Sequence, residues 1–106
     1  MDMKQHAFTM KLKPGYAQEY KRRHDEIWPE LVSLLTASGV SDYAIYLDEK
    51  SNTLFAVQKL AEDFDSSFLP NHPIVKKWWA YMADIMETNL DNSPVEGDLK
   101  EVFYLQ

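Results

Sequence analysis

Alternation of apolar and polar residues marks three stretches of the chain, and a period of two is typical of a strand with one buried face. These stretches run from 6 to 12, from 41 to 47 and from 99 to 105. A fourth stretch, from 53 to 60, is apolar on both faces, so both faces of this strand should be covered. The polar run from 48 to 52 predicts a hairpin loop between the second strand and this one.

Two other segments show the spacing of three and four that indicates an amphipathic helix. The first runs from Tyr16 to Leu35, and Gly39 can end it in a left-handed conformation. Pro29 lies inside this segment, so the helix should kink there or restart with Pro29 in its first turn, which places Trp28 at a bend. The second helix is expected from Ile74 to Met86.

The remaining segments are less regular. The stretch from 62 to 69 predicts a short helix, and the prolines at 70 and 73 mark a break that can also start the following helix. The segment from 90 to 98 contains Asn92-Ser93-Pro94 and Gly97 and predicts a loop.

The predicted order of elements is βαββαβ, and the fold class is therefore α+β. This order matches the ferredoxin-like sandwich, in which four antiparallel strands carry two helices on one face. Two helices leave the other face of the sheet open. Since the strand from 53 to 60 is apolar on that face too, we expect a partner sheet to bury it, or a pocket to form there, and we predict a homodimer through this face.

Composition supports a single globular domain covering residues 1–106, with 45% hydrophobic and 26% charged residues and no internal repeat. The absence of cysteine excludes thiol chemistry and disulfides and fits a reducing compartment. A net charge of -6 argues against a nucleic-acid partner. The basic triplet Lys21-Arg22-Arg23 is therefore expected to be a solvated helix face.

No stretch is apolar enough to span a membrane, and the first four residues lack the apolar run of a signal peptide. We therefore expect no membrane association and a cytoplasmic protein.

His24 is the candidate acid or base of the chain. On a helix, Tyr20, His24 and Trp28 fall on one face because they are spaced by four residues. An unperturbed imidazole has a pKa of about 6.5 and can both give and take protons near neutral pH. The alternative interpretation is that this aromatic stripe is ordinary core.

The other two histidines carry weaker signals. His6 alternates with Phe8 on the first strand, and a hydrogen-bonded histidine of the core or its rim is the favoured interpretation. His72 is expected in an exposed loop. The three histidines are far apart and form no HExxH or comparable motif, so neither a metal site nor a cofactor is expected.

Trp78 and Trp79 are the second unusual feature. Helix neighbours point about 100° apart, so the two indoles cannot both face one core, and one of them should border a cavity. An indole stacks well on the apolar face of a sugar. The alternative is that both fill the edge of the core. Tyr43 can belong to the core or direct its hydroxyl into the same cavity.

Several of these segments together resemble the L-rhamnose mutarotase family. The resemblance lies in residues 20–24, 27–31, 43–48, 78–82, 91–94 and 101–105 and extends in order from about Phe8 to Leu105. It departs from the family pattern at Asp25-Glu26, at the first few residues and from 61 to 73, which bears on the sugar preference more than on the reaction.

The resemblance implies a cofactor-free, dimeric α/β barrel that interconverts the α and β anomers of L-rhamnose. The proton-donating histidine of the family falls on His24, and its substrate-contacting residues fall on Tyr20, Tyr43, Trp78 and Trp79. The small-molecule partner is then L-rhamnose or a related deoxy sugar. Two further hypotheses are a non-catalytic ligand-binding or sensor domain on the same barrel, and a cofactor-free oxygenase of that architecture.

Overall fold

The computed structural model describes residues 3–106, so the first two residues, which belong to the expectation about a signal peptide, lie outside it. Its strands are β1 (Lys4–Lys11), β2 (Val40–Asp48), β3 (Thr53–Leu60) and β4 (Gly97–Asp98). Its helices are α1 (Ala17–Asp25), α2 (Pro29–Ala37) and α3 (Pro73–Met82), with a short 3₁₀ helix, η1 (Leu69–Asn71). The predicted α+β class is confirmed.

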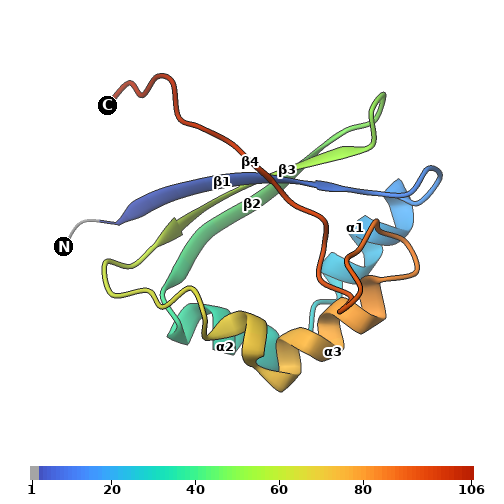
Figure 1. The fold of residues 1–106 in the computed structure, drawn as a ribbon, viewed down its shortest axis with the longest axis horizontal. Helices are drawn as coiled ribbons and strands as arrows, with labels where there is room; N and C mark the ends of the chain where they lie inside the picture. The colour runs from blue at the N-terminus through green and yellow to red at the C-terminus, as the bar shows by residue number, and fades with distance from the viewer. Residues whose placement is uncertain (1–2) are drawn as a thin grey trace.

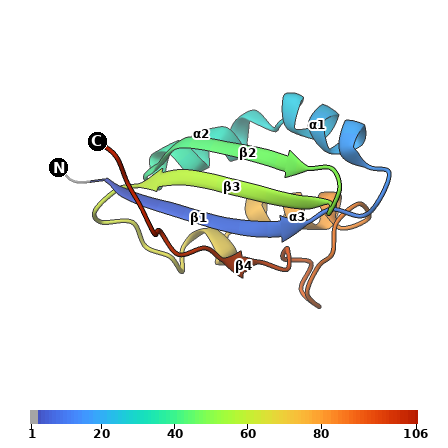
Figure 2. The same cartoon turned by 90° about the horizontal axis from the view of Figure 1, so that it is seen from above.

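The four strands form one antiparallel sheet in the order β2-β3-β1-β4. This is the strand order of the predicted ferredoxin-like fold. The helices lie on one side of the sheet, and the other side is uncovered (Figures 1 and 2). One helical layer thus covers one face of β3, and the expected cover of its other apolar face stays a prediction.

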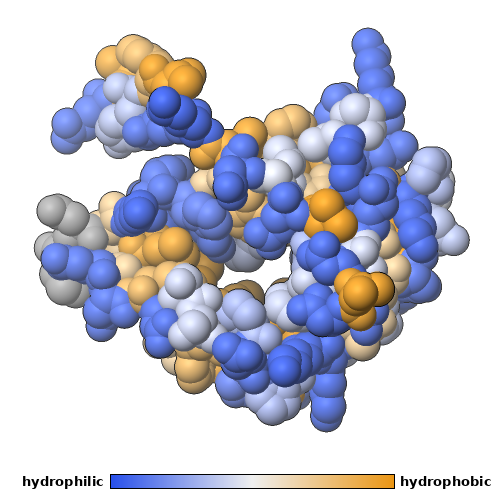
Figure 3. Space-filling model, viewed as in Figure 1, coloured by the Kyte–Doolittle hydropathy of each residue, from blue (hydrophilic) through white to orange (hydrophobic). Residues whose placement is uncertain are grey.

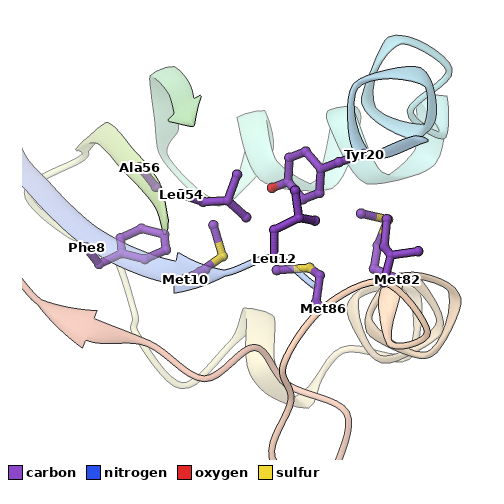
Figure 4. Packing of buried hydrophobic residues seen from close by; sticks show 9 residues of the cluster. Phe8, Met10, Leu12, Tyr20, Leu54, Ala56, Met82 and Met86 are labelled. Atoms are coloured by element: carbon purple, nitrogen blue, oxygen red, sulfur yellow. The ribbon is translucent and has the colours of Figure 1, made fainter. Parts of the chain in front are cut away.

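The core lies between the inner face of the sheet and the helices. Figure 4 shows side chains from β1 and β3 meeting Tyr20 of α1 and residues of α3 and the turn after it. Leu12, Leu54 and Ile85 are fully buried. The alternation of β1 explains this placement, because Phe8, Met10 and Leu12 all point to the helical side.

Pro29 divides the first predicted helix into α1 and α2. The chain leaves the helix after Asp25, Trp28 adopts an extended conformation, and Pro29 occupies the first turn of α2. Proline fits there because its missing N–H would have no helical partner. The restart at Pro29 is thus the one of the two predicted geometries that occurs, and Trp28 lies at the bend.

Gly39 ends α2 in the predicted left-handed conformation, with a φ of +100°. The position is also crowded, because a Cβ there would lie 2.8 Å from Cβ of Ala61, and Ala61 N donates to the carbonyl of Gly39 at 2.8 Å. This contact holds the end of β3 against the start of β2.

The helix predicted from 62 to 69 is wrong. The segment is a series of turns, because Asp65 accepts hydrogen bonds from the backbone N–H and the hydroxyl of Ser67. Such local side-chain bonds compete with helix formation. Regular secondary structure resumes at η1 and then at α3.

The strand predicted from 99 to 105 is also wrong, because the single chain forms no strand over these residues. Pairing with β1 is limited to Gly97 and Asp98, and the residues beyond project away from the body (Figure 1). Alternation gives the segment the propensity of a strand, but a strand also needs a neighbour with which to pair. The exposed side chains include Val102, Phe103 and Leu105.

Candidate active site

A cavity of about 930 Å³ lies between the inner face of the sheet and the helices. Figure 3 shows it as a hollow that opens on one face of the molecule. All five residues singled out in the sequence line it, although they come from three different elements: Tyr20 and His24 from α1, Tyr43 from β2, and Trp78 and Trp79 from α3. The structure therefore brings the predicted residues together, and their roles remain predictions.

His24 is held by the helix that carries it. Its ring stacks on Tyr20 with 4.3 Å between the ring centroids, and Nδ1 lies 3.1 Å from the backbone oxygen of Tyr20. Since a carbonyl oxygen can only accept, this contact places a proton on Nδ1. In the neutral ring, Nε2 is then the nitrogen with the free lone pair.

Burial also favours the neutral form of this ring. It lowers the pKa of His24 below its usual value, and the hydrogen bond to the Tyr20 carbonyl and the charge of Asp25 oppose that change only in part. At neutral pH, His24 is therefore a base with Nε2 available to accept a proton.

The indole of Trp78 connects this histidine to a wider aromatic cluster. It meets His24 edge-on at 5.4 Å and Trp28 at 5.1 Å, and Tyr81 lies 5.6 Å away. Such edge-to-face pairs are favourable beyond the area that they bury. Trp79, half-buried on the adjacent part of α3, also lines the cavity, so the double tryptophan borders it with both of its rings.

The two tyrosines are hydrogen-bond donors at the cavity wall. Burial raises the pKa of Tyr20, and Tyr43 adds to this effect. Burial likewise raises the pKa of Tyr43. The side chain is 40% exposed to solvent, but the exposed part faces the cavity, where protein atoms surround it. Both hydroxyls therefore keep their protons at neutral pH.

The other histidines do not line this cavity. The Nδ1 of His6 lies 2.9 Å from the side-chain nitrogen of Gln58, and its ring stacks on Phe8, as expected of a hydrogen-bonded histidine at the rim of the core. His72 is not simply exposed loop, because its ring accepts a hydrogen bond from the N–H of Ile74 and caps α3. Within residues 3–106, no three histidine or acidic side chains gather in a group that would hold a metal ion.

Sequence reasoning missed the part of the wall that follows α3. Asn92 and Glu96 line the cavity from the segment that leads into β4. Asn92 has a positive φ of 70°, in a turn where Asp91 binds the backbone and hydroxyl of Ser93. The motif Asp91-Asn92-Ser93-Pro94 indicated a turn but carried no signal that it would face the cavity.

Arg23 joins α1 to the end of α3 and is not solvated, contrary to the expectation for the basic triplet. Its guanidinium donates to the carboxylate of Asp84 at 2.8 and 3.2 Å and to the backbone oxygen of Tyr81 at 2.7 Å. The remaining donor, Nε, binds Glu19 at 2.7 Å, and the guanidinium carbon lies 4.7 Å from the centre of the Tyr81 ring. The pair with Glu19 follows from helical spacing by four residues, whereas the contacts across to α3 depend on the tertiary fold.

We expect Arg23→Ala to destabilise the fold far more than Arg22→Ala. Arg23 is 9% exposed, and its loss leaves the Tyr81 carbonyl and Asp84 without their donor, at a cost of about 2 kcal/mol. Arg22 is exposed and binds Glu19 and Glu26 at the surface, where ion pairs contribute little. Thermal melts should show a decrease of about 10 °C for Arg23→Ala and a change of a few degrees at most for Arg22→Ala. Equal melting temperatures would contradict the assignment.

Known proteins match the chain over nearly its whole length. The sequence profile of the L-rhamnose mutarotase family matches residues 5–105. A protein of Rhizobium johnstonii named L-rhamnose mutarotase is 61% identical over 105 residues, covering 99% of both chains. One of the same name from Flavobacterium johnsoniae is 61% identical and covers 93% of this chain and 92% of its own.

A solved structure agrees. The crystal structure of L-rhamnose mutarotase from Formosa agariphila superposes with a TM-score of 0.90 at 55% identity, covering 97% of this chain and 99% of that one. The resemblance found in the separate motifs thus extends to the sequence and the fold as a whole, and the chain belongs to the L-rhamnose mutarotase family.

Proposed function

We propose that this protein interconverts the α and β anomers of L-rhamnose and that His24 transfers the proton. The observation that carries the proposal is the geometry of His24: its Nδ1 is bonded to the Tyr20 carbonyl, which leaves Nε2 free, and its ring lines, together with Trp78 and both tyrosines, a cavity of sufficient size for a monosaccharide. Family membership supports the sugar and the reaction.

Ring opening moves a proton from the anomeric hydroxyl to the ring oxygen. In the proposed mechanism, Nε2 of His24 takes the proton of the anomeric hydroxyl as the bond between C1 and the ring oxygen breaks and the carbonyl forms. The imidazolium then gives the proton to the former ring oxygen, which leaves C1 as an alkoxide and becomes a hydroxyl of the open-chain sugar. Rotation of the open-chain aldehyde and the reverse sequence give the other anomer, so one histidine acts as base and then as acid.

The tyrosines support this transfer without changing their own protonation. Their raised pKa values keep Tyr20 and Tyr43 protonated, so neither is available as a base, and their hydroxyls can donate hydrogen bonds to the oxygen on which negative charge develops. Trp78 and Trp79 provide apolar faces for the sugar ring.

Saturation-transfer NMR of aldose anomers tests the proposal. Adding the protein to L-rhamnose should increase the rate of exchange between the two anomeric proton signals in proportion to protein concentration. A panel of deoxy and ordinary aldoses then reports the preference among sugars. A ligand-binding or sensor domain, or an oxygenase, would bind or react without accelerating this exchange.

The pH dependence of the exchange rate should follow the lowered pKa of His24. Because the neutral ring is the base, activity should be constant from neutral pH down through the usual histidine midpoint and fall only at lower pH, as Nε2 becomes protonated. The rate is measured from acidic to neutral pH, with the rate in buffer alone subtracted. A loss of activity centred at or above the usual value of about 6.5 would contradict the buried, neutral histidine.

We also propose that the protein is a homodimer through the uncovered face of the sheet. Thr9, Phe55 and Tyr46 lie side by side on that face across three strands, and Tyr46 and Phe55 are 65% and 40% exposed. An apolar surface of this kind is typical of an interface between copies. The exposed apolar tail that follows β4 adds to the surface available for a second copy.

Sedimentation should therefore show a dimer at micromolar concentration. Phe55→Lys should shift the protein toward monomer, because a charge on this face would be buried without a partner. Leu90→Lys, a change at a fully exposed loop residue, should leave the dimer intact. A wild-type monomer at that concentration would refute the proposed interface.

Within residues 3–106, no helix is long and apolar enough to cross a bilayer.

A further inference from the structure

Most carboxylates of the cavity wall already have partners or lie at its margin. Asp25 binds Lys21 at 3.0 Å, and Asp42 lies 3.3 Å from the ammonium group of Lys59. Glu49 belongs to the exposed turn between β2 and β3. Glu96 differs from these three, because in the part of the chain that the structure describes it makes neither a salt bridge nor a side-chain hydrogen bond although it lines the cavity.

The register of β4 directs Glu96 toward the cavity. Asp98 lies opposite Phe8 and Gly97 lies opposite Thr9, and side chains alternate along an extended chain, so residue 96 points to the same side of the sheet as Phe8. Phe8 and Met10 face the cavity, and residues opposite one another in a sheet share a face. The side chain of Glu96 is thus on the same side of the sheet as the aromatic residues of the site.

Gly97 fixes this register. A Cβ at Gly97 would lie 2.5 Å from the hydroxyl oxygen of Thr9, and that hydroxyl donates to the Gly97 carbonyl at 3.4 Å. The backbone of β4 therefore approaches β1 more closely than another residue would allow. The close approach sets the position of Glu96 relative to the cavity.

Glu96 and Tyr43 both line the cavity. Burial, and then the charge of Asp98, raise the pKa of Glu96 above its usual value. The charge of Glu96 in turn contributes to the raised pKa of Tyr43. Since both side chains border the same space, one small ligand can contact both.

We propose that Glu96 is a sugar-binding and specificity-determining residue of the proposed mutarotase site, whose carboxylate accepts hydrogen bonds from hydroxyl groups of a neutral sugar and excludes anionic sugars. The inference rests on the proposed function. Sugar hydroxyls both donate and accept hydrogen bonds, and the indole N–H groups of the wall can only donate. The carboxylate of Glu96 can only accept, and as a charged acceptor without a protein partner among residues 3–106 it is suited to bind the proton of a sugar hydroxyl.

An acceptor of this kind also discriminates among sugars. A site built to bind a hydroxyl strongly disfavours an analogue without it, because its own polar group then stays without a partner. A sugar carboxylate or phosphate beside Glu96 would add repulsion between like charges in a partly desolvated space.

The test is the steady-state kinetics of anomer exchange for Glu96→Gln, with Glu87→Gln as the matched control. Both changes replace a glutamate by glutamine in the segment that follows α3, but Glu87 is exposed and does not line the cavity. For Glu96→Gln we expect KM for L-rhamnose to rise about 10-fold, as for the loss of a charge-assisted hydrogen bond, with kcat within about 3-fold of the wild type. Glu87→Gln should leave both values within about 2-fold.

Three results would overturn the assignment. These are an unchanged KM for Glu96→Gln, a fall in kcat without a rise in KM, and an equal change in Glu87→Gln. Melting curves of the two variants establish that both are folded.

A series of monodeoxy sugars identifies the sugar hydroxyl whose hydrogen bond Glu96 accepts. The wild type should bind one of these deoxy sugars more weakly than it binds L-rhamnose. The Glu96→Gln variant should bind that deoxy sugar and L-rhamnose equally, because the variant has already lost the contact between residue 96 and the hydroxyl. If no deoxy sugar of the series shows this coupling, Glu96 does not bind a sugar hydroxyl and the assignment fails. Exchange by the wild type is measured first, so a failure of the mutarotase proposal is distinguished from a failure of this one.

Discussion

Replacing His24 by glutamine is expected to slow anomer exchange by about 10²- to 10⁴-fold, the usual loss when a general acid–base group is removed. Glutamine retains a polar side chain of similar size on α1 but cannot take and return a proton. The fold should remain intact, since the ring makes one hydrogen bond to the backbone of its own helix and its other contacts are aromatic packing. NMR exchange and thermal unfolding are measured on the same sample.

His6→Gln is the matched control for this variant. His6 is also a partly buried, hydrogen-bonded histidine, but it lies outside the cavity and binds Gln58. Its replacement should lower the melting temperature without changing the exchange rate per folded molecule. If folded His24→Gln exchanges anomers at the wild-type rate, the catalytic assignment is wrong, and Tyr20 and Tyr43 become the candidates.

Truncation of the two adjacent tryptophans is expected to give different results. Trp78 packs on His24, Trp28 and Tyr81, so Trp78→Ala should cost about 2 to 3 kcal/mol of folding stability and also weaken sugar binding. Trp79 lines the cavity, and no ring–ring contact holds it among the described residues. Trp79→Ala should therefore raise KM by about 10-fold or more with a stability loss of about 1 kcal/mol.

Thermal melts and the concentration dependence of anomer exchange separate the two effects. We expect Trp78→Ala to melt about 10 to 15 °C below the wild type and Trp79→Ala a few degrees below it. A large stability loss for Trp79→Ala with an unchanged KM would show that this indole belongs to the core and does not contact the sugar.

Much of the fold follows from local patterns in the sequence. The period of two located β1 and β2, the stretch that is apolar on both faces located β3, and the proline at 29 and the glycine at 39 marked the start and end of α2. The final strand failed for a physical reason, since alternation reports which side chains can share a face but not whether a neighbouring backbone is present. The helix at 62–69 failed because the hydrogen bonds of Asp65 to Ser67 favour turns.

The candidate site was predictable where its residues share a helix. Spacing by four residues placed Tyr20 and His24 on one face, and the double tryptophan implied a nearby cavity. Arg23 and Glu96 were missed because their surroundings come from residues far away in the sequence. The contact of Arg23 with Asp84 depends on the approach of α1 to the end of α3, and the direction of Glu96 depends on the pairing of β4 with β1.

The most direct test of the account is the exchange of the anomeric proton signals of L-rhamnose in the presence of the wild-type protein and of His24→Gln. Both are compared at equal folded concentration, with buffer alone as the reference. The account predicts exchange that increases linearly with wild-type protein and falls by at least about 10²-fold in the variant. Exchange that stays at the rate of buffer with the wild type, or that is equal in the two proteins, would contradict it.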